Sequence, residues 1–361
     1  MCGSHLSGVT KLRRSMSTDL LGRIEKEVMP TIEDVSLTVA GEPFLTPKLP
    51  QFLAAAERSG SEVSINTNAT LIKDTDLLRR TLANARVVRF SVDGATKETY
   101  ESIRVQGDFE LVKANIALAV EVREALPRDH RPRLVMCMVL MKRNVHELEA
   151  MVELAHELGL DRLDVAHLTV LVPEMDSESL RHDPNMADTA FQSAQERADA
   201  LGFRVNLPPM MSGARLRPSW VASTRLTAGE MRRLTRKQLI RLGRNLRRKM
   251  TMREWSRKAG GKVPCQFLQD GVFITIQGEV APCPMPGRPI AGNLHQSSFD
   301  AIWNGPTLTA MRRGFITGSP FECCTHCSQN PEGYRPGDPK TVAPSDYELP
   351  GLADRKLASA K

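Results

Sequence analysis

Amphipathic stretches with helical spacing alternate with short apolar runs between residue 18 and about residue 207. The apolar runs are rich in Val, Ile and Leu and show little polar alternation, which is typical of parallel strands covered by helices. This alternation predicts an α/β fold built from repeated βα units. The expected strands are residues 34–39, 62–66, 87–92, 133–140 and 162–167, and the expected helices are residues 18–28, 47–59, 74–84, 109–126 and 145–158.

The pattern changes after residue 207, where two prolines precede a strongly basic segment. Residues 213–262 contain sixteen Lys and Arg but only two acidic residues, whereas the whole chain has a net charge of +7. A Thr-x-x-Glu capping-box pattern and leucines at helical spacing lie within it. We interpret residues 208–262 as a basic helical insertion or linker. Its charge indicates an acidic partner, such as a peptide, a phosphate-bearing molecule or nucleic acid, or else a solvated helical face.

The remaining residues divide into a small domain and a tail. Residues 263–330 contain short apolar runs around a Gln277-Gly278 turn and a small helix near residues 299–303. Residues 331–361 are Pro-rich and polar, which predicts an extended or disordered tail. The predicted organisation is therefore a barrel-like domain over residues 1–207, the insertion, the small domain and the tail.

No apolar run approaches the ~20 residues that a membrane span needs, and no charged-then-apolar signal begins the chain. A cytoplasmic location without a membrane partner is therefore expected. In that compartment, cysteine thiols are expected to be reduced, metal-bound or buried rather than paired as disulfides.

Polar residues follow four of the predicted strands. In parallel α/β sheets, ligands bind at the carboxyl ends of the strands. Turn-forming residues explain any one of these segments, but all four together indicate a shared pocket. The segments are Gly41-Glu42-Pro43, Asn66-Thr67-Asn68, Ser91-Val92-Asp93-Gly94 and Lys142-Arg143-Asn144.

The seven cysteines are unevenly placed. Four thiolates around one centre suit a 4Fe–4S cluster and a structural zinc equally well. Cys323 is an alternative ligand, and Cys137 lies within a predicted strand, where a small buried residue is expected. The expected metal ligands in the C-terminal third are two separated cysteines followed by a Cys-x-x-Cys pair: Cys265, Cys283, Cys324 and Cys327.

An ordered set of motifs resembles the radical S-adenosylmethionine (SAM) superfamily across nearly the whole first two hundred residues. The resemblance implies a partial (β/α) TIM-like barrel rather than a closed one, with a Cys-x-x-x-Cys-x-x-Cys loop that holds a 4Fe–4S cluster for SAM. Cys2 matches the third cysteine of that loop. Because the first two cysteines and the preceding strand are missing here, this chain as written is expected not to cleave SAM. The motifs are Met1-Cys2, Gly41-Glu42-Pro43, Thr67-Asn68, Ser91-Val92-Asp93-Gly94 and Tyr100-Glu101-Ser102-Ile103-Arg104.

The resemblance also implies roles for individual residues. Glu42 looks like the residue that meets the SAM amino group, Ser91 and Asp93 look like ribose contacts, and Arg104 resembles an arginine near the SAM carboxylate. Asn68 follows the Thr-Asn-Gly pattern of the family.

Two alanines depart from the family pattern. Ala69 replaces the glycine after Asn68, and Ala40 replaces a glycine before Gly41. Glycine alone tolerates positive φ cheaply, so these replacements reduce the conformational freedom of both loops.

The C-terminal third resembles the auxiliary iron–sulfur extension called SPASM, or its shorter relative called twitch. Four well-placed cysteines fit the single-cluster version, which favours an auxiliary 4Fe–4S cluster over zinc. The motifs are Gly278-Glu279-Val280-Ala281-Pro282-Cys283, Gly292-Asn293-Leu294, Ile302-Trp303-Asn304 and the pair Cys324 and Cys327.

The resemblance implies an enzyme that forms a 5′-deoxyadenosyl radical and abstracts hydrogen, in the manner of a peptide- or protein-modifying maturase. A small-molecule radical SAM oxidoreductase is an alternative. A non-catalytic iron–sulfur protein is a third, because the cluster loop is incomplete. The expected partners are a peptide, protein or small-molecule substrate and a reducing donor such as flavodoxin or ferredoxin; nucleic acid is not the expected partner.

Overall fold

The computed structural model describes residues 15–37, 41–170, 173–208, 210, 265, 267–268, 271–285 and 287–325. The predicted ligands Cys2 and Cys327, nearly all of the basic insertion and the C-terminal tail lie outside these residues. The chain divides into two compact units. Among the described residues, the first unit holds the predicted barrel from Ile32 onward, and the second holds residues 15–31 together with the C-terminal domain.

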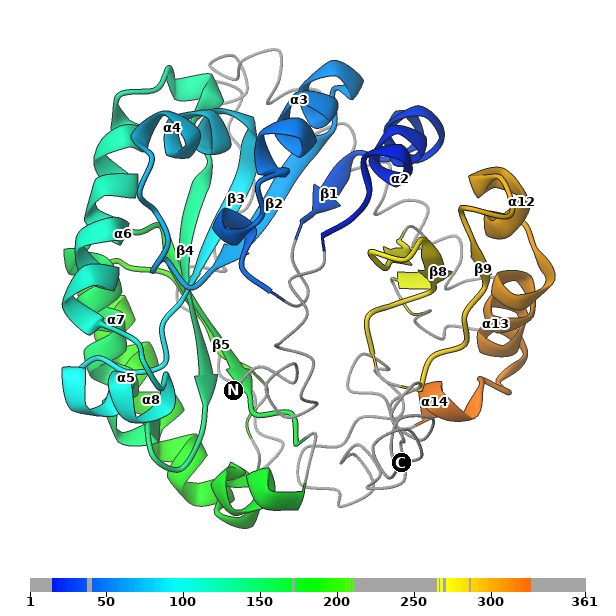
Figure 1. Ribbon diagram of the computed structural model, residues 1–361. Coiled ribbons are helices and arrows are strands. Elements are labelled where there is room, and N and C mark those ends of the chain that lie inside the picture. Colours follow the sequence, from blue (N-terminus) through cyan, green and yellow to red (C-terminus); the bar gives the residue numbers. More distant parts are fainter. Residues whose placement is uncertain are drawn as a thin grey trace, which may run out of the picture. The chain divides into compact units, whose positions relative to one another are not determined.

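Six parallel strands form the sheet of the first unit (Figure 1). Their spatial order follows their sequence order, so each crossover leads to the neighbouring strand. This order is that of a (β/α) barrel and differs from a doubly wound sheet, whose order reverses. The predicted partial barrel is confirmed. The strands are β1 (Asp34–Ser36), β2 (Glu62–Thr67), β3 (Ala85–Ser91), β4 (Arg133–Leu140), β5 (Arg162–His167) and β6 (Val205–Asn206).

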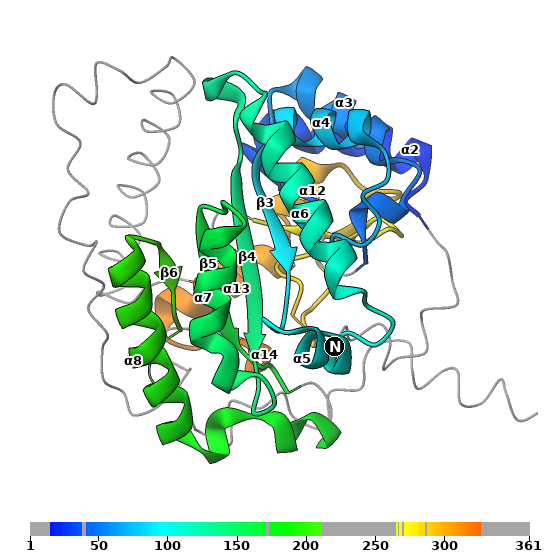
Figure 2. The ribbon, with the colours of Figure 1, turned by 90° about the vertical axis from the view of Figure 1, so that its left-hand side faces the viewer.

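Helices connect the strands, and α6, α7 and α8 lie along one face of the sheet (Figure 2). Asp74, Thr96 and Asp108 each accept a backbone N–H bond at a helix N-terminus, which fixes where α4, α5 and α6 begin. The helices are α3 (Leu49–Ser59), α4 (Thr75–Asn84), α5 (Lys97–Ile103), α6 (Phe109–Glu124), α7 (Leu148–Glu157) and α8 (Pro184–Leu201), and short 3₁₀ turns include η4 (Pro43–Leu45) and η6 (Val145–Glu147).

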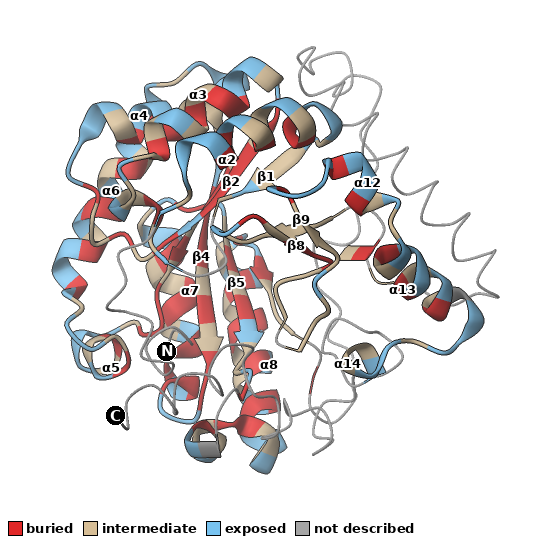
Figure 3. Cartoon of the chain, turned by 45° about the vertical axis from the view of Figure 1, so that its right-hand side comes forward, coloured by how far each residue is buried: buried red, intermediate tan, exposed pale blue. Residues whose placement is uncertain are grey.

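The two faces of the sheet differ in burial, and buried and half-buried residues alternate along much of β4 and β5 (Figure 3). On the face that packs against helices, Val88, Phe90, Leu134 and Met136 are at most 2% exposed. Side chains alternate along a strand, so the residues between them lie on the opposite face. We call this the helix-free face; it carries Ser64, Arg89, Ser91, Cys137 and Asp164 together with the buried Val87 and Val135. A closed barrel fills its interior with branched apolar side chains, whereas this face combines such residues with polar groups that can contact a ligand.

The second unit joins an N-terminal helical segment to the C-terminal domain. The Arg23 guanidinium donates to the carbonyls of Leu294 and Ser297, and Glu27 accepts from Phe299 N at 3.0 Å. The segment predicted as the first helix of the barrel therefore contacts the C-terminal domain. It consists of α2 (Thr18–Arg23), a π-helical turn η2 (Ile24–Val28) and a 3₁₀ turn η3 (Met29–Thr31).

Among the described residues of this unit, a three-stranded antiparallel sheet and three helices follow. The predicted turn lies between β7 and β8, and Gly278 adopts a φ of 82° there. An added Cβ would also lie 2.9 Å from the His295 ring, so this position requires glycine. The elements are β7 (Phe273–Ile274), β8 (Glu279–Ala281), β9 (Gly292–Asn293), α12 (Phe299–Trp303), α13 (Pro306–Thr317) and α14 (Glu322–Thr325).

Within the described residues, no helix combines the length and apolar character needed to cross a membrane.

Candidate functional site

The Glu42 carboxylate joins the loops that follow β1 and β2. Its Oε1 accepts from Phe44 N at 3.2 Å and from Thr67 Oγ1 at 2.7 Å, and its Oε2 accepts from Asn68 N at 2.8 Å. A carboxylate offers about four acceptor positions. Three are used, so Oε2 retains one position for another donor.

Burial is the main influence on the ionisation of Glu42 and raises its pKa. The hydrogen bonds from Asn68, Thr67 and Phe44 and the positive charge of Arg104 act in the opposite direction and offset part of this rise. Arg104 is thus close enough to influence Glu42 electrostatically. A cationic ligand group at the open position of Oε2 would further stabilise the carboxylate.

The loop after β2 has the backbone conformation that the glycine of the family pattern would favour. Ala69 has a φ of 60°, in the left-handed region that costs a non-glycine residue about 1 kcal/mol. Its methyl group is fully buried, and Asn115 Nδ2 donates to its carbonyl at 2.7 Å. Asn68 Oδ1 accepts from both Thr70 N and Thr70 Oγ1, which closes the turn.

Asp93 holds Arg104 in place. The Asp93 side chain is 1% exposed, and its Oδ2 lies 2.7 Å from both Nε and Nη2 of Arg104. Its Oδ1 accepts from Val139 N at 2.8 Å, which ties the loop after β3 to strand β4. Among the described residues, the remaining nitrogen of Arg104, Nη1, has no hydrogen-bond partner. The ion pair therefore orients a guanidinium that still has a donor to offer.

Ser91 ends strand β3 and lies opposite Cys137 on the helix-free face. It is half-buried, and its hydroxyl makes no hydrogen bond to another described residue. The structure thus brings the predicted residues to one edge of the sheet: Asn68 donates to Glu42, Asp93 pairs with Arg104, and Arg104 influences Glu42.

Glu147 is a functional candidate that the sequence reasoning missed. Its carboxylate accepts from Ala95 N at 2.7 Å, from Thr96 N at 3.3 Å, from Thr96 Oγ1 at 2.5 Å and from Thr99 Oγ1 at 2.6 Å. Burial alone would raise the pKa of Glu147, but these hydrogen bonds outweigh it and lower the pKa. Glu147 thus anchors the N-terminus of α5, whose opposite end carries Arg104.

Asn144 reinforces the same arrangement and is fully buried. Its Nδ2 donates to the carbonyls of Asp93 and Val139, both at 2.9 Å, and its Oδ1 accepts from Met141 N at 2.7 Å. The polar segment after strand β4 was noticed in the sequence, but only the fold reveals that it supports the preceding loop.

Replacing Gly94 by Ala is expected to destabilise the protein by about 2 kcal/mol, because an added Cβ would lie 2.6 Å from Tyr100 N in the backbone of α5. Urea-induced unfolding measures the change. Gly22→Ala is the control, since its Cβ would meet no atom within 4 Å in helix α2. Equal stability of the Gly94→Ala variant and the unaltered chain would contradict this close approach.

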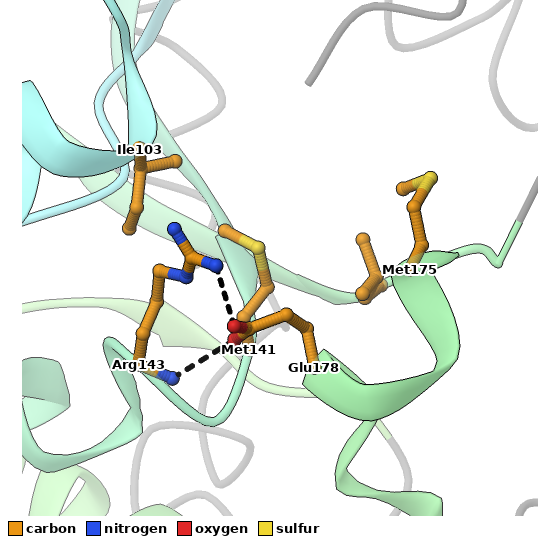
Figure 4. Close-up of a pocket in the computed structure, with 6 residues that line it drawn as sticks. Ile103, Met141, Arg143, Met175 and Glu178 are labelled. Atoms are coloured by element: carbon orange, nitrogen blue, oxygen red, sulfur yellow. Dashed lines mark hydrogen bonds and ion pairs between the residues drawn. The ribbon is translucent and has the colours of Figure 1, made fainter. Parts of the chain in front are cut away.

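An apolar pocket lies beside this site, at the carboxyl ends of β4 and β5 (Figure 4). Arg143 Nη2 and Glu178 Oε1 form an ion pair at 2.5 Å there, and Arg143 N donates to Glu178 Oε2. The hydrogen bond from Arg143 lowers the pKa of Glu178. The two charges neutralise each other, so the pocket offers mainly apolar surface. Its lining residues are Ile103, Met141, Arg143, Leu168, Met175 and Glu178.

The described cysteines of the second unit, Cys265, Cys283, Cys323 and Cys324, are half-buried and form no disulfide with one another. Within the part of the chain that the structure describes, no three His, Cys, Asp or Glu side chains are arranged to hold a metal ion. The predicted convergence of Cys265, Cys283, Cys324 and Cys327 stays a prediction, because Cys327 lies outside the described residues. Cys323 Sγ lies 3.8 Å from Cys324 Sγ, and this contact lowers the pKa of Cys323 to about 7.

Two buried arginine nitrogens support an anionic group near these cysteines. Arg312 donates to the carbonyls of Leu268 and Trp303 and lies over the Trp303 ring, while its buried Nη2 has no hydrogen-bond partner among the described residues. Leu268 ends the turn that begins at Cys265. Arg288 lies on the loop after Cys283 and over the Phe273 ring, and its buried Nε likewise has no hydrogen-bond partner among the described residues. Unpaired buried donors are costly. Four thiolates and an iron–sulfur cluster would supply acceptors, so the chemistry of these residues fits such a group.

Cys137 lies within β4, as predicted, and is half-buried. Burial raises the pKa of its thiol to about 12, so the thiol stays protonated near neutral pH.

Comparisons with known proteins match both parts of the chain. Residues 1–155 match the radical SAM superfamily, and residues 265–328 match SPASM, an iron–sulfur cluster-binding domain. A curated relative from Pyrococcus furiosus, a tungsten-containing aldehyde ferredoxin oxidoreductase cofactor-modifying protein, is 26% identical over 54% of this chain and 54% of its own length. This chain spans about half the length of the curated relatives it matches.

Solved structures show the same fold at low sequence identity. Native anSMEcpe with bound AdoMet and Kp18Cys peptide has a TM-score of 0.55 and 16% identity, covering 92% of this chain and 84% of its own. Streptococcus suis SuiB bound to S-adenosylmethionine has a TM-score of 0.54 and 13% identity, covering 83% of this chain and 61% of its own. The matched domains agree with the expected cofactors, iron–sulfur clusters and SAM. The chain belongs to the radical SAM superfamily and carries a C-terminal SPASM domain.

Proposed function

We propose that this protein binds SAM at the carboxyl ends of β1, β2 and β3 and uses it to abstract hydrogen from a peptide or protein. One observation carries the proposal: an open carboxylate position on Glu42 lies within electrostatic reach of an open guanidinium nitrogen on Arg104. These two groups complement the ammonium and carboxylate of an amino acid, and SAM ends in that pair. A 4Fe–4S cluster, when bound with SAM, supplies reductive cleavage to a 5′-deoxyadenosyl radical.

Each residue at this edge has a distinct task in the proposal. Glu42 accepts a hydrogen bond from the SAM ammonium, Arg104 Nη1 donates to its carboxylate, and Ser91 bonds the ribose. Asn68 orients the Glu42 carboxylate through its backbone N–H. Asp93 was expected to touch the ribose, but its occupied oxygens favour positioning of Arg104.

The SPASM domain has a supporting role in this proposal. Cys265, Cys283, Cys324 and Cys327 would hold the auxiliary cluster, with Arg288 and Arg312 placing positive charge beside it. The electron would come from a small reducing protein of the flavodoxin or ferredoxin type. Cys2 would be one thiolate of the cluster that binds SAM.

A peptide or protein substrate is supported by the fold and by the apolar pocket. The solved structure of anSMEcpe, which shares this fold, contains a bound peptide. Met141 and Met175 line the pocket beside the site, and methionine side chains adapt to irregular apolar groups. A small-molecule oxidoreductase is the second candidate, favoured by the curated relative that modifies a cofactor.

Reductive SAM cleavage tests the proposed function. Three iron–sulfur-reconstituted proteins are incubated anaerobically with SAM and dithionite. They are the chain itself, the same chain preceded by its upstream reading frame, and the Glu42→Gln form of whichever of these is active. We expect about tenfold less 5′-deoxyadenosine after Glu42→Gln than from the unaltered active protein. No 5′-deoxyadenosine from either unaltered protein would contradict the enzyme proposal and favour a non-catalytic iron–sulfur protein.

The affinity for SAM is expected to fall on acidification at a higher pH than for an exposed glutamate, because the pKa of Glu42 is raised and only its carboxylate attracts the ammonium. In the absence of SAM, acidification has the opposite effect on protein stability: it favours the folded state. The folded state favours the protonated carboxyl, so its contribution is present below the unfolded pKa and is lost as pH rises through the raised pKa. Calorimetric titration with SAM across pH measures the first effect. An identical pH profile for Glu42→Gln would contradict it.

A further inference from the structure

Two arginines lie on the helix-free face of the first unit, Arg89 on β3 and Arg162 on β5, and a third, Arg86, lies on β3 where its register with β2 shifts. The face of Arg89 follows from its neighbours, since Val88 and Phe90 are buried in the core against the helices. Arg162 lies on the same face as Asp164, which is opposite Cys137 in the register of β4 and β5.

Two of these arginines are neutralised within the sheet. Arg86 Nε lies 2.9 Å from Asp34 Oδ2 and 3.9 Å from Glu62 Oε2. Arg162 Nε lies 2.6 Å from Asp164 Oδ1, and its Nη2 donates to Asp164 Oδ2 at 2.8 Å. Arg86 and Arg162 are therefore each paired with a carboxylate of the sheet.

Arg89 differs from both. Its cross-strand neighbours are Asn66 on β2 and Val135 on β4, neither of which is acidic. Among the described residues, the Arg89 guanidinium forms no ion pair and no hydrogen bond, although the residue is half-buried. Its charge does act on Cys137, where it opposes the larger effect of burial on the thiol.

A half-buried cation without a counterion loses hydration and gains nothing in exchange within the fold. An anionic ligand group would supply the missing acceptors, and a planar guanidinium binds carboxylate or phosphate oxygens through two parallel hydrogen bonds. Arg89 also lies two residues before Ser91, the proposed ribose contact, on the same face of the sheet. It is therefore farther than Ser91 from the carboxyl end of β3.

We propose that Arg89 is an anion-binding residue that holds a carboxylate or phosphate group of the substrate on the helix-free face. The assignment of that anion to the substrate rests on the proposed function, in which Arg104 takes the SAM carboxylate. The capacity of Arg89 to bind an anion does not depend on it.

Inorganic phosphate is the first probe. Its effect on the melting temperature is compared with that of chloride at equal ionic strength for the full chain, Arg89→Gln and Arg162→Gln. A ligand that binds the folded state raises the melting temperature in proportion to its occupancy. We expect phosphate to stabilise the unaltered chain and Arg162→Gln but not Arg89→Gln. Arg89→Lys should be stabilised partly, since Lys keeps the positive charge but cannot donate two parallel hydrogen bonds from a planar group. Equal stabilisation of Arg89→Gln, or no stabilisation of the unaltered chain, would overturn the proposal.

The second probe is SAM, which separates the two sources of the anion. Equilibrium dialysis with Arg89→Gln is expected to give a Kd for SAM within about twofold of the unaltered chain. A Kd raised by about tenfold would assign Arg89 to the SAM carboxylate and overturn the substrate assignment. Phosphate binding that is lost in Arg89→Gln, in a protein that fails to cleave SAM, would leave the anion site standing and refute only the proposed function.

Discussion

Cys283→Ser is expected to lower the iron content of the reconstituted protein by about four atoms per chain, because the serine hydroxyl cannot replace a thiolate in a 4Fe–4S cluster. Cys283 lies in the residues that match the SPASM domain, on the loop that leads to Arg288. Iron, sulfide and zinc are measured after anaerobic reconstitution.

The matched control is Cys137→Ser. Cys137 lies in strand β4 of the other unit, and burial keeps its thiol protonated. Its replacement is expected to leave iron and sulfide unchanged. Unchanged iron in Cys283→Ser would contradict the auxiliary cluster, and a site that takes up zinc alone would restore the structural-zinc alternative while leaving the barrel unaffected.

Asp93→Asn is expected to lower both stability and SAM affinity. The Asp93 carboxylate is 1% exposed, and an uncharged amide in its place cannot accept from Val139 N and also pair with Arg104. Arg104 would therefore lose its ion pair. Breaking such a pair costs about 3 kcal/mol, and the released guanidinium no longer presents Nη1 in a fixed position. We expect the Kd for SAM to rise by about tenfold or more. Urea unfolding and equilibrium dialysis measure the two effects.

Asp161→Asn separates stability from ligand binding. Asp161 also accepts from a backbone N–H, that of Leu134 at 2.6 Å, and pairs with an arginine, Arg123, at 2.8 Å. It lies at the opposite end of strand β4 from Val139. Its replacement is therefore expected to lower stability and leave SAM affinity unchanged. Equal losses of SAM affinity in both variants would show that Asp93 acts only through general stability.

The sequence predicted the central strands well because their apolar runs are long and uninterrupted. Strands β4 and β5 have the predicted bounds, and α4 begins one residue later than expected because Asp74 is its N-cap. Strand β1 ends at Ser36, earlier than the predicted residue 39. Helices α5 and α8 and strand β6 were not predicted. Helix α5 is short and largely polar, and strand β6 has two residues, so neither of these two elements gives a clear periodic signal.

The sequence motifs identified most residues of the candidate site, but they did not reveal the contacts among these residues. Glu42 and Arg104 were identified from their positions after two strands, and the structure relates them electrostatically. The sequence could not show that Asp93 uses both oxygens within the protein, or that Glu147 anchors α5 across 48 to 52 residues of chain. Such contacts depend on how the loops after β3 and β4 meet. The unpaired state of Arg89 likewise follows from strand register and from no local pattern.

The central claim is that Glu42 recognises the ammonium group of SAM, and its most direct test compares two ligands. SAM carries the amino-acid group, whereas 5′-methylthioadenosine has the same nucleoside without it. Calorimetric titration of the unaltered chain and Glu42→Gln is expected to show that the substitution raises the Kd for SAM by about tenfold or more and changes that for 5′-methylthioadenosine by less than about twofold. An equal loss of affinity for both ligands, or unchanged affinity for SAM, would contradict the claim.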